Sequence, residues 1–565
     1  MSQTTPTKIP PVCHFWEIWR NPIFLRYCRA RLRPTGLGAS CLITILVSGF
    51  LFQMIRTFSD NRTELDVMDI ERAPLVTLLI IQAFILFVLG TAQASGGMTA
   101  ERDEGVIDYQ RLLPMSSVSK VIGYLFGLPI RETVMFLCTL PFTLWCFIRG
   151  QVPLGVMLSI YGVMASTTLL YHLTGLLTGT IVKNRRWAFL MTIGLIFSLY
   201  TIIPQAAKFG LVFFKYLTIT PTIQDAMPDL VPKTFGAAID VSRRLFSEAR
   251  FFNLDFPEAV FTWFTQACLI ITFFVMLCRR WRDADAHLSG KLWASGFFLW
   301  IQILLLGNSI PLIDSGKLFP TQQFARFSVF TRGQQWEPDR WEAMAMILAY
   351  GFLTLILLWV MSSLITPSYE TVVNGWRRAH KLQKNRLPLL ADESNSTPYV
   401  LVMSLIGGAG WFYFTHMIVE SRWFPGHFSP ISNSGWFLLA IVTCGLLHHL
   451  ILELKGTRTL FMCIIFIVVV PLMLSAILFG TSDRLQPLAL WVGGISPLGL
   501  PFLTAANHLS ITELPLLIDR TVPSVWTFWQ GVYIIVIMRL TYSLYQKRSR
   551  LKATLLSQSS APTST

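Results

Sequence analysis

Apolar residues along the chain gather into twelve long runs that are separated by polar or basic segments. Each run holds about 17 to 25 residues, enough for a helix rising 1.5 Å per residue to cross the roughly 30 Å hydrocarbon core of a bilayer. The predicted spans lie near residues 37–55, 74–95, 124–148, 154–180, 188–206, 258–278, 293–310, 344–365, 399–419, 435–453, 460–480 and 524–544. The pattern predicts an all-α polytopic membrane protein with about twelve transmembrane helices.

The polar segments between the runs have the same order of long and short loops in the first six runs and in the last six. In each group of six runs, a long segment follows the second run, at 96–123 and 366–398, and a tight basic turn follows the fourth, at 183–186 and 455–458. Because six crossings return the chain to the same side, both halves would have the same orientation in the membrane. We therefore expect two parallel six-helix repeats.

The predicted organisation has five parts. They are a cytoplasmic tail with an interfacial elbow helix (1–36), a first six-span half (37–280), a cytoplasmic linker (281–292), a second six-span half (293–546) and a basic cytoplasmic tail (547–565). Residues 486–505 are apolar but are interrupted by glycines and prolines, so they are expected to form a re-entrant or interfacial helical hairpin rather than another span.

Composition agrees with a membrane protein. The 565 residues are 53% hydrophobic and 14% charged, with a mean hydropathy of +0.54. Water-soluble domains usually carry about 25% charged residues. These values exclude an ordinary soluble, fibrous or disordered protein.

The net charge of +15 would also suit a nucleic-acid-binding protein, but the membrane topology explains it. With a cytoplasmic N-terminus, the predicted inner segments hold 27 Lys and Arg residues and the outer segments hold 17. Basic residues are enriched in cytoplasmic loops. We therefore expect both termini in the cytoplasm, the plasma (cytoplasmic) membrane as the location, the lipid bilayer as surroundings and no nucleic-acid partner. The polar residues 1–11 also give no sign of a cleavable secretion signal.

The cysteine, histidine and glycine patterns indicate no disulfide, metal site or nucleotide-binding loop. None of the nine cysteines falls in a predicted outer loop, and no Cys or His spacing suits a metal, so neither a disulfide nor a metal site is expected. No segment matches the Gly-x-x-x-x-Gly-Lys-Ser/Thr phosphate-binding loop. The chain is expected to be no enzyme and to hydrolyse no ATP itself.

Residues 16–34 combine aromatic and aliphatic side chains with five arginines. Pro22 is a favourable first helical residue, so a helix is expected from there, lying along the membrane interface with its arginines in water or on phosphates. The alternative is an ordinary basic anchor next to the membrane.

The segment 96–116 is the only acidic one on the predicted inner side. Thr99 could cap a short helix whose first turn carries Glu101, Asp103 and Glu104, with Pro114 as its end. The alternative is a solvated loop with a chance cluster of acids.

Residues 101–116 read Glu-Arg-Asp-Glu-Gly-Val-Ile-Asp-Tyr-Gln-Arg-Leu-Leu-Pro-Met-Ser. This resembles a loop of ABC export permeases of the type-2 class, which commonly read Glu-Arg-Glu-x-Gly-Thr-Leu-Glu followed by Leu-Leu, Pro and Ser. The departures at Asp103, Val106 and Asp108 are conservative. The resemblance implies a coupling helix that rests in a cleft of a cytoplasmic ATPase. The implied ATPase-facing positions are Glu101, Arg102, Asp103, Glu104 and Gly105.

The resemblance implies a full-length permease subunit of an ATP-driven ABC exporter with an unidentified substrate. Two copies of a separate ABC ATPase subunit would bind ATP and Mg, and this chain would bind no cofactor. The matching segment of the second half, 366–381, lacks the acidic cluster. It is either a diverged coupling segment or a basic lipid-binding face.

Polar residues within the spans support a second hypothesis. Arg131 and Glu132 follow Pro129 early in the third span, where they form either a local pair at the helix end or a site on a translocation path. The alternative function is a proton- or ion-coupled twelve-span secondary transporter, and a membrane-embedded transferase is a further rival. His172 is expected to bond to a neighbouring helix, whereas His448 and Glu453 are expected to be hydrated.

Overall fold

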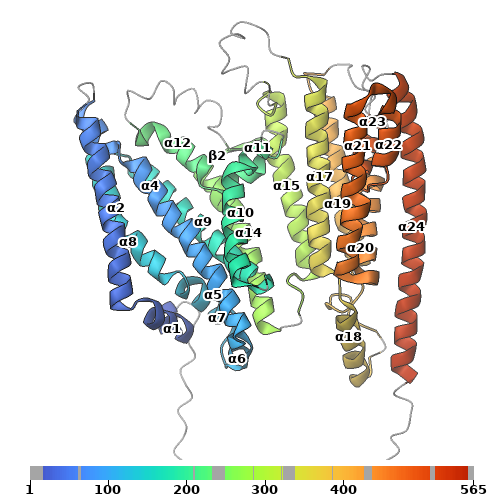
Figure 1. Cartoon of the computed structure of the whole chain (residues 1–565), viewed down its shortest axis with the longest axis horizontal. Coiled ribbons are helices and arrows are strands. Elements are labelled where there is room, and N and C mark those ends of the chain that lie inside the picture. The colour runs from blue at the N-terminus through green and yellow to red at the C-terminus, as the bar shows by residue number, and fades with distance from the viewer. Residues whose placement is uncertain are drawn as a thin grey trace, which may run out of the picture. The chain divides into compact units, whose positions relative to one another are not determined.

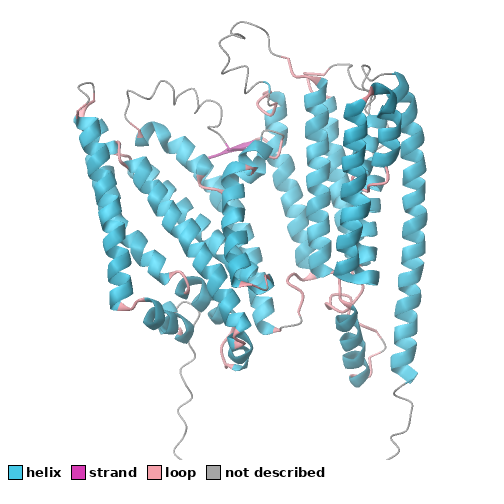
Figure 2. Ribbon diagram, in the orientation of Figure 1, coloured by secondary structure: helices cyan, strands magenta, loops and turns pink. Residues whose placement is uncertain are grey.

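A computed structural model of the chain describes most of its residues. The described ranges are 17–61, 65–182, 184–207, 210–231, 249–283, 286–319, 321, 337–384, 386–424, 435–508 and 516–557. Figure 2 shows that this part of the chain is almost entirely helical, with one short two-stranded sheet of β1 (Ala249–Phe251) and β2 (Leu254–Phe256). The prediction of an all-α polytopic membrane fold is confirmed.

The described residues contain 11 helices that are long and apolar enough to cross a membrane. One of them, Gly435–Thr481, has 47 residues and would be about 70 Å long if it were straight, more than twice the hydrocarbon core. Gly456 interrupts it with φ 81° and ψ 178°, a conformation outside the helical region that glycine adopts without strain. The two arms on either side of Gly456 match the predicted spans 435–453 and 460–480.

The contacts divide the chain into two compact units. Unit 1 comprises Met1–Pro204, Lys215–Ala249 and Phe256–Ala284, and unit 2 comprises Gln205–Phe214, Arg250–Asp255 and Asp285–Thr565. The main division falls inside the predicted linker, although two short segments of the first half belong to unit 2. The parallel repeat of six helices stays a prediction.

Helix α1 in unit 1 starts at the predicted proline, Pro22. Figure 1 shows the helices of this part of the chain in blue to green. Its helices are η1 (Ile18–Arg20), α1 (Pro22–Arg31), α2 (Pro34–Asp60), α3 (Val67–Arg72), α4 (Leu75–Ala83), η2 (Phe84–Gly90), α5 (Thr91–Asp103), α6 (Val106–Leu112), α7 (Ser117–Gly127), α8 (Ile130–Arg149), α9 (Leu154–Ile181), α10 (Arg185–Thr201), α12 (Thr220–Leu230) and α14 (Glu258–Arg282). The short helices α11 (Ile203–Ala207) and η3 (Val212–Leu217) lie where the chain passes between units. The third span begins at Ile130 rather than at 124, because Pro129 separates α7 from α8.

Helix α5 packs closely against α9 through small residues. A Cβ at Gly175 would lie 2.8 Å from the carbonyl oxygen of Thr91, and one at Gly179 would lie 2.7 Å from that of Ser95. Small residues let two membrane helices approach until their backbones nearly touch. This contact holds α5 against the C-terminal end of α9.

The helix that leads into α5 contains a π-helical turn, η2. His172 of α9 lies against this turn, with Nε2 3.1 Å from the carbonyl oxygen of Leu86. Gly90 makes room for the ring, since a Cβ there would lie 2.6 Å from Nε2. The predicted bond of His172 to a neighbouring helix is confirmed.

Unit 2 places α19 among α15, α17 and α20. Its helices are α15 (Lys291–Asp314), α17 (Arg340–Ile365), α18 (Tyr369–Lys381), α19 (Thr397–Val419), α20 (Gly435–Cys463), η6 (Ile464–Val469), α21 (Val470–Thr481), η7 (Asp483–Leu485), α22 (Gln486–Gly493), α23 (Gly499–His508) and α24 (Leu516–Ser557). Buried Trp411 of α19 donates from Nε1 to the carbonyl oxygen of Ile347 at 2.9 Å. Two short helices, α22 and α23, lie in the segment 486–505, and its re-entrant or interfacial position stays a prediction.

Candidate coupling site

The acidic segment of the first half forms a corner between two helices, which we call the α5–α6 corner (residues 101–112). The predicted cap at Thr99 is wrong, because Thr99 is buried inside α5, which continues to Asp103. The chain turns at Gly105, with φ 71° in the left-handed region that favours glycine. A second short helix, α6, then ends before Pro114.

Glu101 joins three helices. Its Oε1 accepts hydrogen bonds from Arg26 Nη2 at 2.5 Å and from the Tyr27 hydroxyl at 2.7 Å, both on α1. Its Oε2 accepts one from the Tyr124 hydroxyl of α7 at 3.0 Å. Hydrogen bonds to an ionised carboxylate are stronger than neutral ones. Glu101 therefore ties the end of α5 to α1 and α7.

The two phenols around Glu101 remain protonated at physiological pH and donate to its carboxylate, while the Tyr27 oxygen also accepts a hydrogen bond from Arg26 Nη2 at 3.0 Å. Burial raises the pKa of the Tyr27 hydroxyl far above its usual value, and the negative charge of Glu101 raises it further. Burial likewise raises the pKa of Tyr124. Both groups stay protonated, so their bonds to the carboxylate persist across the physiological pH range.

Arg102 anchors the corner to the end of α9. Its guanidinium donates to the carbonyl oxygens of Gly179 at 3.1 Å and Val182 at 2.6 Å, in the last turn and at the C-cap of that helix. It also pairs with Asp103 at 2.8 Å. The last carbonyls of a helix lack partners within the helix and carry partial negative charge, so a cation there is stabilising.

Helix α6 is held from its inner side. Its buried Gln110 has its side-chain oxygen 2.7 Å from the Tyr124 hydroxyl, whose single proton it shares with Glu101. Arg111 donates to the carbonyl oxygen of Arg280 near the end of α14 at 3.2 Å. Lys120 of α7 donates to the carbonyl oxygen of Leu113 at 3.2 Å. The corner is thus fixed to α7, α9 and α14 together.

The outer side of the corner combines acidic and apolar residues, and we call it the coupling face. Leu112 is 82% exposed and Tyr109 is 67% exposed. Three acidic residues are also exposed there, namely Asp103, Glu104 and Asp108. Large apolar side chains left in water next to charged ones are typical of a surface that binds another protein.

The five positions implied by the resemblance therefore divide into two groups. Glu101 and Arg102 turn inward and hold the corner in place, whereas Asp103, Glu104 and Gly105 face outward. The sequence alone does not show which of the five side chains point inward, because their bonding partners are 20 or more positions away in the chain.

A cleft of about 130 Å³ lies beside the corner. Its lining includes three arginines, Arg102, Arg111 and Arg280, and one acidic residue, Asp108, which pairs with Arg111. The Nε atom of Arg111 is buried and has no hydrogen-bond partner among the residues that the structure describes. The cleft therefore has a positive character next to the acidic coupling face.

Arg131 and Glu132 form an ion pair of 2.8 Å in the first turn of α8. Glu132 is buried, with 1% of its side chain exposed, and its Oε2 has no partner among the described residues. The pair lies at the end of the span, where the sequence allowed either a local pair or a site on a translocation path. Burial lowers the pKa of the nearby Arg31 guanidinium, and the negative charge of Glu132 partly offsets this lowering.

Unit 2 contains a buried polar cluster that the sequence did not reveal. His449 lies between the hydroxyls of Thr366 at 2.8 Å and Thr397 at 3.1 Å, and its Nε2 is 3.4 Å from Glu453. Glu453 pairs with Arg548 of α24. The expectation that His448 and Glu453 are hydrated is wrong, because both side chains are buried in unit 2.

Comparison with known proteins does not assign the chain to a family. No protein-family model, curated protein or solved structure matches this chain.

Proposed function

We propose that this chain is the membrane permease subunit of an ATP-driven exporter of the type-2 ABC class, and that a separate cytoplasmic ATPase docks on the coupling face. The observation that carries the proposal is the α5–α6 corner, a rigid projection whose outward side bears acidic and apolar residues. Its sequence is also the segment that resembles the coupling loop of that class.

The corner suits a mechanical role. A push on α6 would pass through Arg102 to the end of α9 and through Arg111 to the end of α14, because both arginines bond to main-chain carbonyls there. Packed helices move as rigid bodies, so the push would tilt whole spans. In this proposal the chain performs no covalent chemistry, and ATP and Mg bind to two copies of the ATPase.

The proposal also includes a location. The net charge of the predicted inner segments favours the plasma membrane with both termini in the cytoplasm. The coupling face would then lie in the cytoplasm, where a nucleotide-binding subunit can reach it. The substrate is not identified by these residues.

A pull-down from mild detergent tests the proposal. The native tagged chain is expected to bring down an ATPase with a phosphate-binding loop, and Glu104→Lys combined with Leu112→Ala is expected to lose it. The side chain of Glu104 makes no hydrogen bond or ion pair with the described residues, so the variant should fold. Asp60→Lys, at the C-terminal end of α2, combined with Val67→Ala, at the start of α3, is the matched control and should keep the ATPase. If no ATPase accompanies the native chain, the proposal fails.

A proton- or ion-coupled secondary transporter is the second candidate. The buried Glu132, whose Oε2 lacks a partner among the described residues, favours it. An intramembrane carboxylate of this kind can carry a proton. Transport that continues without ATP but stops on Glu132→Gln, in sealed vesicles with a proton gradient, would support this alternative over the exporter.

A further inference from the structure

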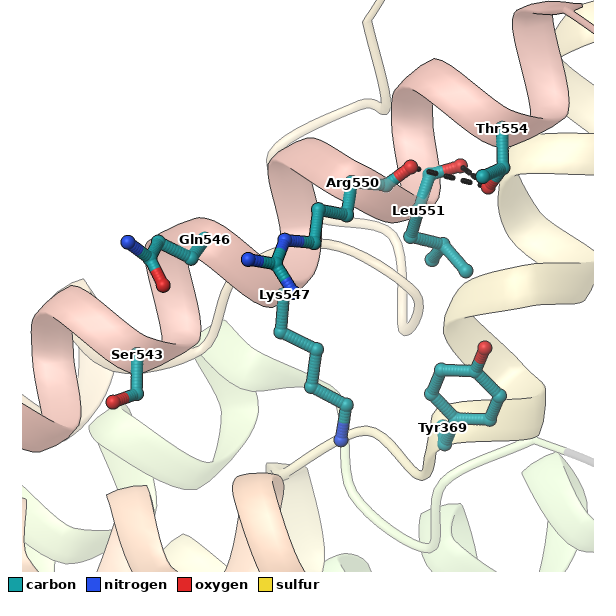
Figure 3. A pocket seen from close by; sticks show the side chains of 7 residues that line it. All are labelled: Tyr369, Ser543, Gln546, Lys547, Arg550, Leu551 and Thr554. Atoms are coloured by element: carbon teal, nitrogen blue, oxygen red, sulfur yellow. Dashed lines mark hydrogen bonds between the residues drawn. The ribbon is translucent and has the colours of Figure 1, made fainter.

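A groove of about 560 Å³ runs between α18 and α24 in unit 2, shown in Figure 3. Its lining residues are Tyr369 of α18 and Ser543, Gln546, Lys547, Arg550, Leu551 and Thr554 of α24. The α24 residues recur every three or four positions, so they share one face of that helix. Two of the lining residues are cations and none is a carboxylate, so the groove is positively charged.

Two cation–π contacts hold the walls of the groove in place. The ammonium of Lys547 lies 5.1 Å from the ring centroid of Tyr369, and that of Lys552 lies 5.5 Å from the ring of Trp376. Lys547 also donates to the carbonyl oxygen of Leu454 at 3.1 Å. The two lysines thus link α24 to α18 and α20.

Arg550 differs from the two lysines. Its guanidinium makes no hydrogen bond or ion pair with any residue that the structure describes, and it is exposed. Figure 3 shows its side chain on the same stretch of α24 as that of Lys547. A planar guanidinium presents five donors that match the oxygens of a phosphate, so Arg550 has its full binding capacity available.

The position of the groove along α24 decides what can reach it. Apolar side chains upstream on this helix are exposed, among them Ile535 and Met538, as expected where lipid tails surround a span. Tyr542 and Tyr545 follow, 61% and 70% exposed, at the point where aromatic residues mark a membrane interface. The groove begins at Ser543, so its near end lies at the depth of lipid headgroups.

We propose that this groove binds the phosphate-bearing headgroup of an anionic phospholipid in the leaflet on the C-terminal side of the membrane. Lys547 and Arg550 would contact the phosphate, and the acyl chains would lie along the apolar upstream face of α24. Basic pockets beside membrane helices on the cytoplasmic side bind anionic headgroups in this way. The lipid site does not depend on the proposed export function.

Native mass spectrometry of the full chain in detergent tests the lipid site, with phosphatidylglycerol and phosphatidylcholine as probes. The native chain is expected to retain phosphatidylglycerol preferentially. Arg550→Gln should weaken that binding about fivefold, the effect of one cation near a membrane surface. Arg550→Lys, which keeps the charge, should lose less.

The matched control is Arg377→Gln, which removes the same charge from an exposed position on α18 outside the groove. It should leave lipid binding unchanged. An equal loss for both variants would mean that the attraction is diffuse, and equal binding of the two lipids would also overturn the proposal. If millimolar inorganic phosphate displaces phosphatidylglycerol from the native chain, the groove is a site for soluble anions and the lipid assignment is wrong.

Discussion

At the scale of single residues, Glu101 has a different role from the one its sequence context suggests. It is the first residue of the segment that resembles a coupling loop, yet its carboxylate receives three hydrogen bonds from α1 and α7. Contact with an ATPase requires an exposed side chain, and that of Glu101 is mostly covered. Glu101 therefore supports the coupling face from behind, through its bonds to α1 and α7.

Replacing Glu101 with Gln should test this supporting role. The substitution keeps the size of the side chain but removes the charge that Arg26 and the two phenols bind. Hydrogen bonds to charged groups contribute about 1.5–3 kcal/mol, so the free energy of unfolding should fall by about 2 kcal/mol. Thermal unfolding of the purified chain in detergent would measure the change.

Asp103→Asn is the matched control for that measurement, because Asp103 is exposed and its carboxylate pairs with the neighbouring Arg102. Exposed substitutions usually change stability by less than about 0.5 kcal/mol. If both variants unfold like the native chain, Glu101 has no supporting role and is free to face a partner.

At the scale of elements, the helix predicted to begin at Thr99 begins elsewhere in the structure. A helix start was predicted at Thr99, but Thr99, Gly96 and Gly97 all lie inside α5. Gly97 is there for packing, since a Cβ would lie 2.3 Å from Leu128 Cδ2. Glycine in a membrane helix often marks a close helix contact rather than an end.

Elements set by local signals were predicted well. Pro22 starts α1, and Gly493, Gly494 and Pro497 separate α22 from α23. The supports of the corner and the His449 cluster were not predictable, because their partners are distant in sequence. Glu453 and Arg548, for example, are 95 positions apart.

Gly179→Ala should separate α5 from α9 and destabilise unit 1. The added Cβ would lie 2.7 Å from both the Ser95 oxygen and the Met98 Cβ, closer than atoms can approach. Overpacking of this kind reduces stability by about 1–3 kcal/mol. Gly155→Ala, on the same helix with nothing within 4 Å of the new Cβ, is the control. Thermal unfolding should show a loss for the first variant only, and equal behaviour would refute the close contact.

At the scale of the whole molecule, the division into units does not follow the order of the chain. Residues 205–214 and 250–255 lie in the first half but belong to unit 2. Ser309 donates to the carbonyl oxygen of Gly210 at 2.7 Å, and Phe252 donates from its main-chain nitrogen to Gly307 at 2.8 Å. Unit 2 is therefore completed by segments from the other half of the sequence.

The fragment 285–565 made alone should therefore be less stable than unit 2 in the full chain, because it lacks both segments. Protease resistance in detergent would measure this. The full chain cut after synthesis at an engineered site between residues 284 and 285 is the control, since it contains every segment. We expect faster digestion of the lone fragment, and equal resistance would show that the two segments add nothing.

The π-helical turn η2 changes the direction in which the side chains that follow it point around the helix axis. A π turn holds one residue more than an α-helical turn of 3.6 residues, so it rotates everything after it by about 100° relative to an uninterrupted α-helix. Glu101 and Arg102 lie little more than ten residues beyond it, on the same continuous helix. Deleting a single residue within Phe84–Gly90 would turn both side chains away from their partners. The direction in which the side chains of the α5–α6 corner point is therefore set by a turn in the middle of the span rather than by residues at the membrane surface.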